Sequence, residues 1–451
     1  MLSLTFYGGA NEIGGNKILL EDKDAKIYLD FGQSFNFGKD YFYDWLQPRS
    51  VNGLEVMFEF NLMPKIEKLY SSNSLAYTDL KYQQPNIDAV FISHSHSDHV
   101  NHIQYLDENI PIYMGHGTKV ILDAYAQLYP QFCKLGEHKY SLFKSGDKIK
   151  IKHLIIEPIH VEHSIPGAYG FIITTSKGKI IYTGDFRLHG PKESYSREFI
   201  EKAKQAKPYA MLCEGTRMSA ESRENFSEEG VERKIDGIIS GSKGIVFAYF
   251  SMSNVDRFFS FYRAAKKSGR TLVIDTKFAF ILDSLREKIT ELPDPKRDKL
   301  LKVYFRLAKS GTFNEKDYYK YEREYMENMI TYKELEKNPK KYIMHLNFFK
   351  LMELIYIQPK NADFIYSSSE HFLEGEENED QTKVMMNWMG HFNIKFHQAH
   401  CSGHVDRKGL IEAIDAIKPE ILVPIHTHNA KEFEKLHKRV ILPEKGGKIE
   451  I

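Results

Sequence analysis

The sequence predicts an α/β protein, and three observations carry this prediction. Asn86–Ser93 and Lys179–Thr183 are short apolar runs typical of buried strands, and polar residues follow each directly. Gly244–Phe250, Val255–Lys267 and Thr271–Asp275 alternate strand, helix and strand patterns, which is one βαβ unit. The chain of 451 residues, 42% hydrophobic and 27% charged, is long enough for two or three domains with cores of their own.

The N-terminal region, to about residue 212, alternates strand-like runs with turns. Leu2–Tyr7 and Lys26–Leu29 are predicted strands, and Gly8-Gly9 and Gly14-Gly15 are predicted turns. In α/β enzymes the chemistry lies where strands end in polar residues. We therefore expect the functional site after the two buried strands of this region.

The middle of the chain differs in character from both ends. Between about 310 and 345, Lys, Glu and Tyr predict a solvated helix with no site. After 390 the strand pattern returns in Asn393–His397 and Ile421–Ile425, around a helix with apolar Leu410, Ile414 and Ile417 on one face. The sequence thus predicts one domain made of residues 1–212 and 389–451, with residues 213–388 inserted into it.

Composition excludes some classes of protein and leaves others open. No apolar stretch is long enough to cross a bilayer, and the N-terminus lacks the pattern of a signal peptide. The three cysteines, Cys133, Cys213 and Cys401, form no disulfide or zinc-finger pattern, so a cytoplasmic location is expected. A net charge of +1 neither supports nor excludes a nucleic-acid partner.

The strongest functional signal is the segment His94-Ser95-His96-Ser97-Asp98-His99, which directly follows an apolar strand. Such a segment can direct His94 and His96 to one metal ion, and Asp98 and His99 to a second. A metal-free surface cluster is the weaker alternative, because four groups that repel one another or stay unpaired need a reason to gather.

His163 and Asp185 are the next candidates, since each lies at a strand end beside a turn. Taken singly, either residue could be a helix cap or a polar core residue. Together with the first cluster they complete a set of imidazole and carboxylate ligands that suits zinc and also manganese, with Asp185 as the candidate bridge. Two such ions suit hydrolysis of phosphodiesters, esters or lactams, and the chemistry alone does not choose.

The segment from His94 to His99 matches the HxHxDH motif of the metallo-β-lactamase superfamily, and His163 and Asp185 follow in the order of that superfamily. Gly8–Gly15 and the strand ending Tyr28-Leu29-Asp30 resemble its first motif. The resemblance implies that Asp30 orients metal-binding histidines and does not itself bind metal.

Three further positions resemble the nucleic-acid-processing β-CASP branch of the superfamily. Glu214, His404 in Ser402-Gly403-His404, and His426 match its motifs A, B and C, and the long stretch between Asp185 and His426 suits an inserted domain. A histidine at motif C is typical of the members that act on RNA. The resemblance implies an αββα metallo-β-lactamase fold with an inserted β-CASP α/β domain.

Within that branch the chain resembles the ribonuclease J family, through His163–Pro166, Gly184–Phe186 and Ala248–Asn254. The resemblance implies that His404 contacts the scissile phosphate or leaving oxygen and that Glu214 orients it. It implies two zinc ions, one held by His94, His96, His163 and Asp185, and the other by Asp98, His99, Asp185 and His426. The implied function is a ribonuclease, exonuclease or endonuclease, that acts on single-stranded RNA.

The sequence also departs from that family. His426 precedes Thr427-His428-Asn429 where the family has Gly-Glu, and Tyr366–His371 lacks the family's phosphate-binding glycines. The hydroxyls of Ser367, Ser368 and Ser369 are candidates for binding a 5′ phosphate, with a plain polar turn as the alternative; Ser251 and Ser253 are further candidates for substrate contact. No segment matches the family's C-terminal dimerisation domain, which leaves a monomer, a homodimer and a processing complex open.

Two other functions are compatible with the sequence. An ester or lactone hydrolase of the same fold would use the same metal cluster but would leave Glu214 and His404 unexplained. A non-catalytic scaffold is disfavoured because no ligand position is missing. Arg187, which follows Asp185, is expected to contact either substrate or solvent.

Overall fold

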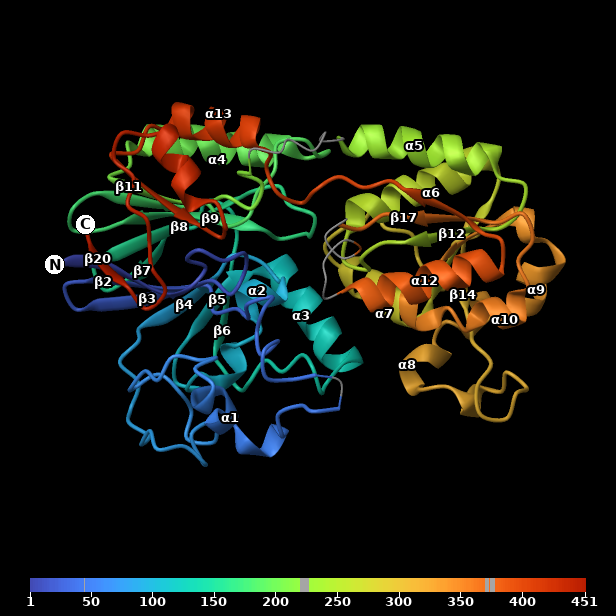
Figure 1. The fold of residues 1–451 in the computed structure, drawn as a ribbon, viewed down its shortest axis with the longest axis horizontal. Coiled ribbons are helices and arrows are strands. Elements are labelled where there is room, and N and C mark those ends of the chain that lie inside the picture. The colour runs from blue at the N-terminus through green and yellow to red at the C-terminus, as the bar shows by residue number, and fades with distance from the viewer. Residues whose placement is uncertain (44, 220–226, 370–372, 374–377) are drawn as a thin grey trace. The chain divides into compact units, whose positions relative to one another are not determined.

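The structure, a computed structural model, describes residues 1–43, 45–219, 227–369, 373 and 378–451. The chain divides into two compact units (Figure 1). Unit 1 comprises Met1–Leu188, Lys192–Arg223 and Gly403–Ile451; unit 2 comprises His189–Pro191 and Glu224–Ser402. These boundaries lie later in the chain than the predicted ones, at 212 and 388. Strand β11 (Ala210–Glu214) still pairs within unit 1, and β18 (Lys395–Gln398) pairs within unit 2.

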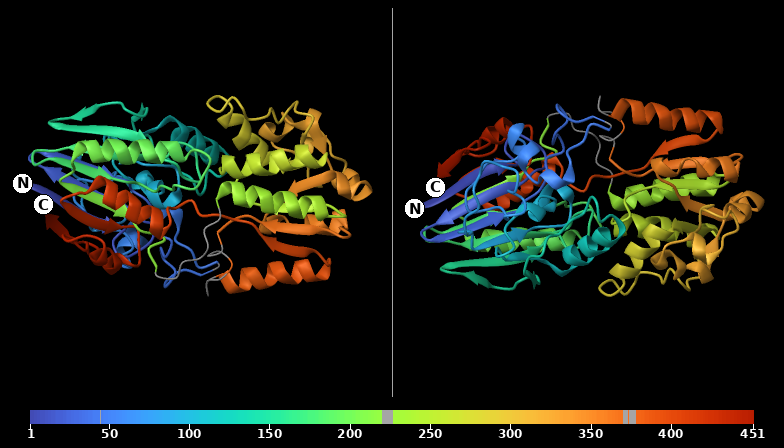
Figure 2. Two further views of the ribbon diagram at one scale, coloured as in Figure 1. Left: turned by 90° about the horizontal axis from the view of Figure 1, so that it is seen from above. Right: turned by 90° about the horizontal axis from the view of Figure 1, so that it is seen from below.

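Unit 1 contains two sheets. The first has the strand order β20-β1-β2-β3-β4-β5-β6, with β1 Leu2–Gly8, β2 Lys17–Asp22, β3 Ala25–Leu29, β4 Ala89–Ile92, β5 Ile112–Gly115, β6 Tyr140–Phe143 and β20 Lys448–Glu450. The second has the order β19-β11-β10-β9-β8-β7, with β7 Ile149–Ile151, β8 Leu154–His160, β9 Tyr169–Thr174, β10 Lys179–Tyr182 and β19 Ile421–Ile425. The two chain termini lie side by side in Figures 1 and 2, because β20 pairs with β1.

The two sheets of unit 1 pack face to face, with helices on their outer faces. Alternation along each strand sends Phe91 and Tyr182 into the core between the sheets, whereas Val90 and Ile181 face the outer layers. On the second sheet the outer layer consists of α4 (Glu193–Ala206) and α13 (Arg407–Ile417). On the first sheet it includes α1 (Glu55–Glu59), α2 (Ser97–Val100) and α3 (His116–Leu128). Unit 1 therefore has the predicted αββα layering.

Unit 2 is built on one parallel sheet of the order β15-β14-β13-β16-β12-β17-β18. Its remaining strands are β12 Val246–Tyr249, β13 Thr271–Asp275, β14 Leu301–Tyr304, β15 Met329–Ile330, β16 Tyr342–His345 and β17 Asp363–Tyr366. Its longer helices are α5 Glu228–Gly241, α6 Val255–Ser268, α7 Thr276–Leu285 and α12 Glu379–His391, and they run alongside the strands in Figure 2. The short helix α10 spans Glu353–Ile357. The predicted βαβ unit is confirmed as β12, α6 and β13.

The prediction of a solvated helix between 310 and 345 was wrong. The segment forms the short helices α8 (Lys320–Arg323) and α9 (Tyr332–Lys337) and three turns of 3-10 helix, and strands β15 and β16 join the sheet. Capping boxes at Asn314 and Thr331 start new helical turns there, so the segment is divided into short elements. Among the described residues, no helix is long and apolar enough to cross a membrane.

Candidate metal centre

The candidate ligands of unit 1 lie where strands end. His94 follows β4, and His163 follows β8, whereas Asp185 and His426 follow β10 and β19. Since β10, β11 and β19 are parallel neighbours, their carboxyl ends share one edge of the sheet. Gly184 is needed in the turn before Asp185, because it has φ of +55° and a Cβ there would lie 2.6 Å from the Tyr169 carbonyl oxygen.

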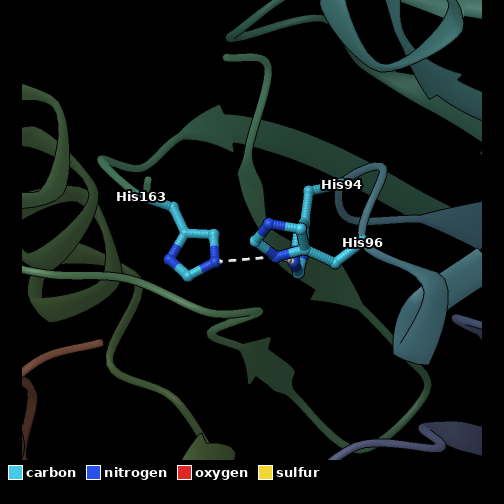
Figure 3. Close-up of side chains that lie close together, drawn as sticks. All are labelled: His94, His96 and His163. Atoms are coloured by element: carbon cyan, nitrogen blue, oxygen red, sulfur yellow. Dashed lines mark hydrogen bonds between the residues drawn. The ribbon is translucent and has the colours of Figure 1, made fainter. Parts of the chain in front are cut away.

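His94, His96 and His163 form a group that we call the imidazole site (Figure 3). Nδ1 of His96 lies 2.9 Å from Nε2 of His94 and 3.1 Å from Nε2 of His163. Burial lowers the pKa of all three rings, that of His96 to about 4. The rings are therefore neutral near pH 7, which is the protonation state that binds metal.

Asp98, His99, Asp185 and His426 form the mixed site, and all four are buried. Nε2 of His426 lies 3.0 Å from Oδ2 of Asp98, and Nε2 of His99 lies 3.1 Å from Oδ2 of Asp185. Burial opposes ionisation of Asp98, but His99 and His426 hold its pKa well below the usual value. Burial likewise opposes protonation of His99, but Asp185, Asp98 and Asp30 raise its pKa well above the usual value.

Asp185 lies between the two sites. Its Oδ2 is 3.7 Å from Nε2 of His94 and 4.0 Å from Nε2 of His163, and it is 3.8 Å from Nε2 of His426 in the mixed site. Its Oδ1 is buried without a hydrogen-bond partner in the described part of the chain. A buried carboxylate oxygen without a partner is costly unless a cation accounts for it. The residues present therefore fit bound metal, and Asp185 lies close to the nitrogen atoms of both sites.

Asp30 orients the ring of His99 in the mixed site through the ring nitrogen Nδ1. Its Oδ2 lies 2.7 Å from Nδ1 of His99 and also accepts hydrogen bonds from the hydroxyls of Ser93 and Tyr182, at 2.8 and 2.5 Å. Asp30 adopts φ of +58°, a strained conformation for a residue with a side chain. Its position matches the predicted orienting role, because a carboxylate on the second ring nitrogen fixes which nitrogen faces the metal.

Other ligands are also held through their second ring nitrogen. Oγ1 of Thr216 lies 2.8 Å from Nδ1 of His426, and the Gly403 carbonyl oxygen lies 2.5 Å from Nδ1 of His163. His426 has φ of +53°, so its backbone is strained as well. These contacts leave Nε2 of both rings to face the centre.

His404 and Glu214 lie together at the edge of the mixed site. Nδ1 of His404 is 3.2 Å from each carboxylate oxygen of Glu214 and 3.8 Å from Oδ2 of Asp185. Although burial opposes protonation, Glu214 and Asp185 raise the pKa of His404 to about 9. Glu214 accepts hydrogen bonds from the backbone N–H groups of Phe186 and Thr216, at 3.1 and 3.2 Å. His404 is thus held as an imidazolium next to the candidate bridging ligand.

The structure brings together all seven predicted metal ligands with Asp30, Glu214 and His404, whereas the predicted substrate-binding serines lie in unit 2. Oγ of Ser251 is 3.0 Å from Oγ of Ser253. Ser367 is buried, and its hydroxyl donates to the Ala399 carbonyl oxygen and accepts from Arg257. Ser368 and Ser369 are partly buried. Since Ser367 is already engaged within the protein, it is the weakest of these candidates.

Sequence reasoning missed Thr216 and misjudged Arg187. Arg187 does not contact solvent, because it is fully buried and pairs with Glu162. Thr216 and Glu162 are single residues without a local pattern, so only their closeness in sequence to Glu214 and His163 could have indicated them.

The fold and the centre define the class of protein to which the chain is similar. Residues 71–221 match the family model of the beta-lactamase superfamily domain. A crystal structure of a protein of unknown function from Enterococcus faecalis V583 is 27% identical, with a TM-score of 0.77 over 99% of each chain. The chain therefore shares the α/β fold of that structure, and residues 71–221 are similar to the class predicted from the HxHxDH motif.

Curated relatives narrow the resemblance to ribonuclease J. Ribonuclease J of Helicobacter pylori (strain 26695) is 24% identical, in a match that covers 100% of this chain and 61% of that protein. Ribonuclease J of Sinorhizobium meliloti is 29% identical over 46% of this chain and 37% of that protein. The predicted resemblance to ribonuclease J is confirmed, although the chain spans less than two thirds of the length of these relatives.

Proposed function

We propose that the chain is a metal-dependent hydrolase that cleaves phosphodiester bonds of single-stranded RNA, of ribonuclease J type. The observation that carries the proposal is the position of Asp185, whose Oδ2 lies within 4.0 Å of Nε2 of His94, His99, His163 and His426. The relatives that bear the name ribonuclease J favour RNA over other esters.

The proposed cofactors are two zinc ions, with manganese as the alternative that the same donors accept. His94, His96, His163 and Asp185 would hold one ion, and Asp98, His99, Asp185 and His426 the other. When bound, such ions supply activated water and neutralise charge on the reacting phosphate.

The chain's own residues complete the proposed mechanism. Asp98 at the mixed site, which stays ionised because His99 and His426 lower its pKa, would accept a hydrogen bond from the attacking water and hold or relay its proton. The imidazolium of His404, charged because Glu214 accepts from its Nδ1, would stabilise the leaving oxygen. Because buried Glu214 already holds the His404 imidazolium in place, the two side chains need not rearrange during the reaction.

We further propose that unit 2 corresponds to the inserted β-CASP domain and contributes RNA contacts through Ser251, Ser253, Ser368 or Ser369. A cytoplasmic location and a homodimer or processing complex stay predictions from the sequence. No specific feature of the centre supports the alternative function of an ester or lactone hydrolase, because that activity does not explain the presence of His404 and Glu214.

The test is digestion of a 5′-labelled single-stranded RNA and of its DNA counterpart by zinc-loaded protein. The matched samples are the Asp98→Ala/His99→Ala double variant and Arg197→Gln, which breaks two exposed ion pairs of unit 1, with Glu193 and Glu412. We expect RNA cleavage by wild type and Arg197→Gln but not by the double variant, and product lengths separate exonuclease from endonuclease cleavage. Zinc-loaded protein that cleaves neither strand would contradict the proposal.

A further inference from the structure

Unit 1 contains a buried ion pair between the segments that carry His163 and Asp185. Glu162 directly precedes His163, and Arg187 lies two residues after Asp185. Arg187 is 0% exposed and Glu162 is 3% exposed. Nη2 of Arg187 lies 3.4 Å from Oε1 of Glu162, and the Arg187 backbone N–H donates to the Glu162 carbonyl oxygen at 2.8 Å. The two ligand-bearing segments are therefore joined by both side chains and backbone.

Glu162 is also anchored to the start of helix α4. Its Oε1 accepts the backbone N–H of Lys192, the residue that caps α4, at 2.9 Å. Its own backbone N–H donates to Oγ of Ser196, which is fully buried, also at 2.9 Å. A carboxylate at a helix N-terminus is favourably placed in the field of the helix dipole. Glu162 thus links α4, Arg187 and the segment that ends in His163.

Stability alone is a weak reason to bury these charges. Removing two ions from water costs about as much as their attraction returns, and apolar residues of similar volume often serve equally well. Unlike an apolar contact, the ion pair is directional, because a guanidinium binds a carboxylate in a defined geometry. Such geometry matters most where neighbouring side chains must converge on one point.

We propose that the Glu162–Arg187 ion pair positions His163 and Asp185 for metal binding at the imidazole site. Among the described residues, neither belongs to the groups that could hold a metal ion, and both side chains are buried, so we assign them a positioning role. His94 and His96 come from a different segment, after β4, and they meet His163 and Asp185 only if the second sheet presents these two correctly. Metal affinity of the imidazole site therefore depends on the ion pair, whichever ester the centre hydrolyses.

The test compares metal binding of full-length wild type with Glu162→Gln, Arg187→Met and Arg187→Lys. Zinc content and affinity are measured by chelator competition, and the coordination of each equivalent is followed by the visible spectrum of cobalt-loaded protein. We expect Glu162→Gln and Arg187→Met to weaken one metal equivalent about 10- to 100-fold, as outer hydrogen-bond partners of metal sites do. The other equivalent should weaken less, because it depends on Asp185 but not on His163, and Arg187→Lys, which keeps the charge, should recover part of the loss.

Two further variants separate positioning from stability. Arg197→Gln breaks an exposed ion pair with Glu412 in the same unit, and it should leave both metal equivalents unchanged. If either single variant fails to fold, Glu162→Leu/Arg187→Met removes both charges together and should fold with one equivalent still weakened. Wild-type affinity for both equivalents in a folded variant without the ion pair would overturn the inference, even if thermal stability fell. Wild-type protein that binds no zinc would overturn the metal centre and the inference together.

Discussion

The two halves of the centre are built from opposite electrostatics. The imidazole site contains three rings that burial keeps neutral, whereas the mixed site pairs a protonated His99 with the ionised Asp98 and Asp185. In the metal-free protein the imidazole site is thus an uncharged set of donors, and the mixed site is a network of opposite charges. Metal binding requires loss of a proton only where a ring carries one, so the two halves should differ in affinity and in their response to pH.

Asp185→Asn should remove the difference between the halves, because Asp185 is the ligand they share. We expect both equivalents of zinc to weaken by more than about 100-fold, beyond the effect of losing an outer hydrogen-bond partner. Chelator competition measures this, with Asp147→Asn, an exposed carboxylate of the same unit, as the control. Retention of one tightly bound equivalent would mean that Asp185 belongs to one site and not to both.

Thr216→Val should affect the mixed site alone. The substitution keeps the shape of the side chain but removes the hydroxyl that lies 2.8 Å from Nδ1 of His426. We expect about a 10-fold loss of affinity for one equivalent, at the lower end for such partners, and no change in the other. Cobalt-loaded protein reports which equivalent changes, and an equal loss in both would show that the halves are coupled more tightly than their separate contacts indicate.

The sequence predicts the ligands of the centre better than the contacts that orient them. The ligands from His94 to His99 lie in six consecutive residues after a strand, so local sequence suffices to find them. The strands Thr271–Asp275 and Ile421–Ile425 were predicted with the bounds that the structure has, because dense β-branched runs specify strands locally. Local sequence patterns thus predicted these strands and the edge at which the centre lies, whereas the αββα layers were implied by the family resemblance.

The contacts that orient the ligands could not be predicted in this way. Thr216 reaches His426 across 210 positions of sequence, and Asp30 reaches His99 across 69. The strained φ of +53° at His426 has no signature in residue type, since glycine is absent there. In the 310–345 segment, the composition indicated that side chains face solvent, but it could not indicate whether the segment forms one continuous helix. The failure arose because capping residues, and not charge, decide where each short helix begins.

The last prediction concerns the stability of the metal-free protein against pH, where the halves should act in opposite directions. Burial lowers the pKa of His96 to about 4. Below pH 6.5 this ring is therefore protonated in the unfolded chain but not in the folded protein, and the free energy of unfolding falls as the pH drops. Glu214 and Asp185 raise the pKa of His404 to about 9 against the effect of burial, so its contribution is complete below pH 6.5 and is lost between pH 6.5 and about 9. Each proton contributes a slope of at most about 1.4 kcal/mol per pH unit.

Urea unfolding in the presence of a chelator, from pH 4.5 to 9.5, should therefore give a maximum near pH 6.5. His96→Asn should flatten the acid side of the profile and leave the alkaline side, because the substitution removes a ring that resists protonation. His404→Gln should flatten the alkaline side, since it removes the imidazolium that Glu214 stabilises. A profile in which either variant changes both sides equally would contradict the separation of the centre into a neutral half and a charged half.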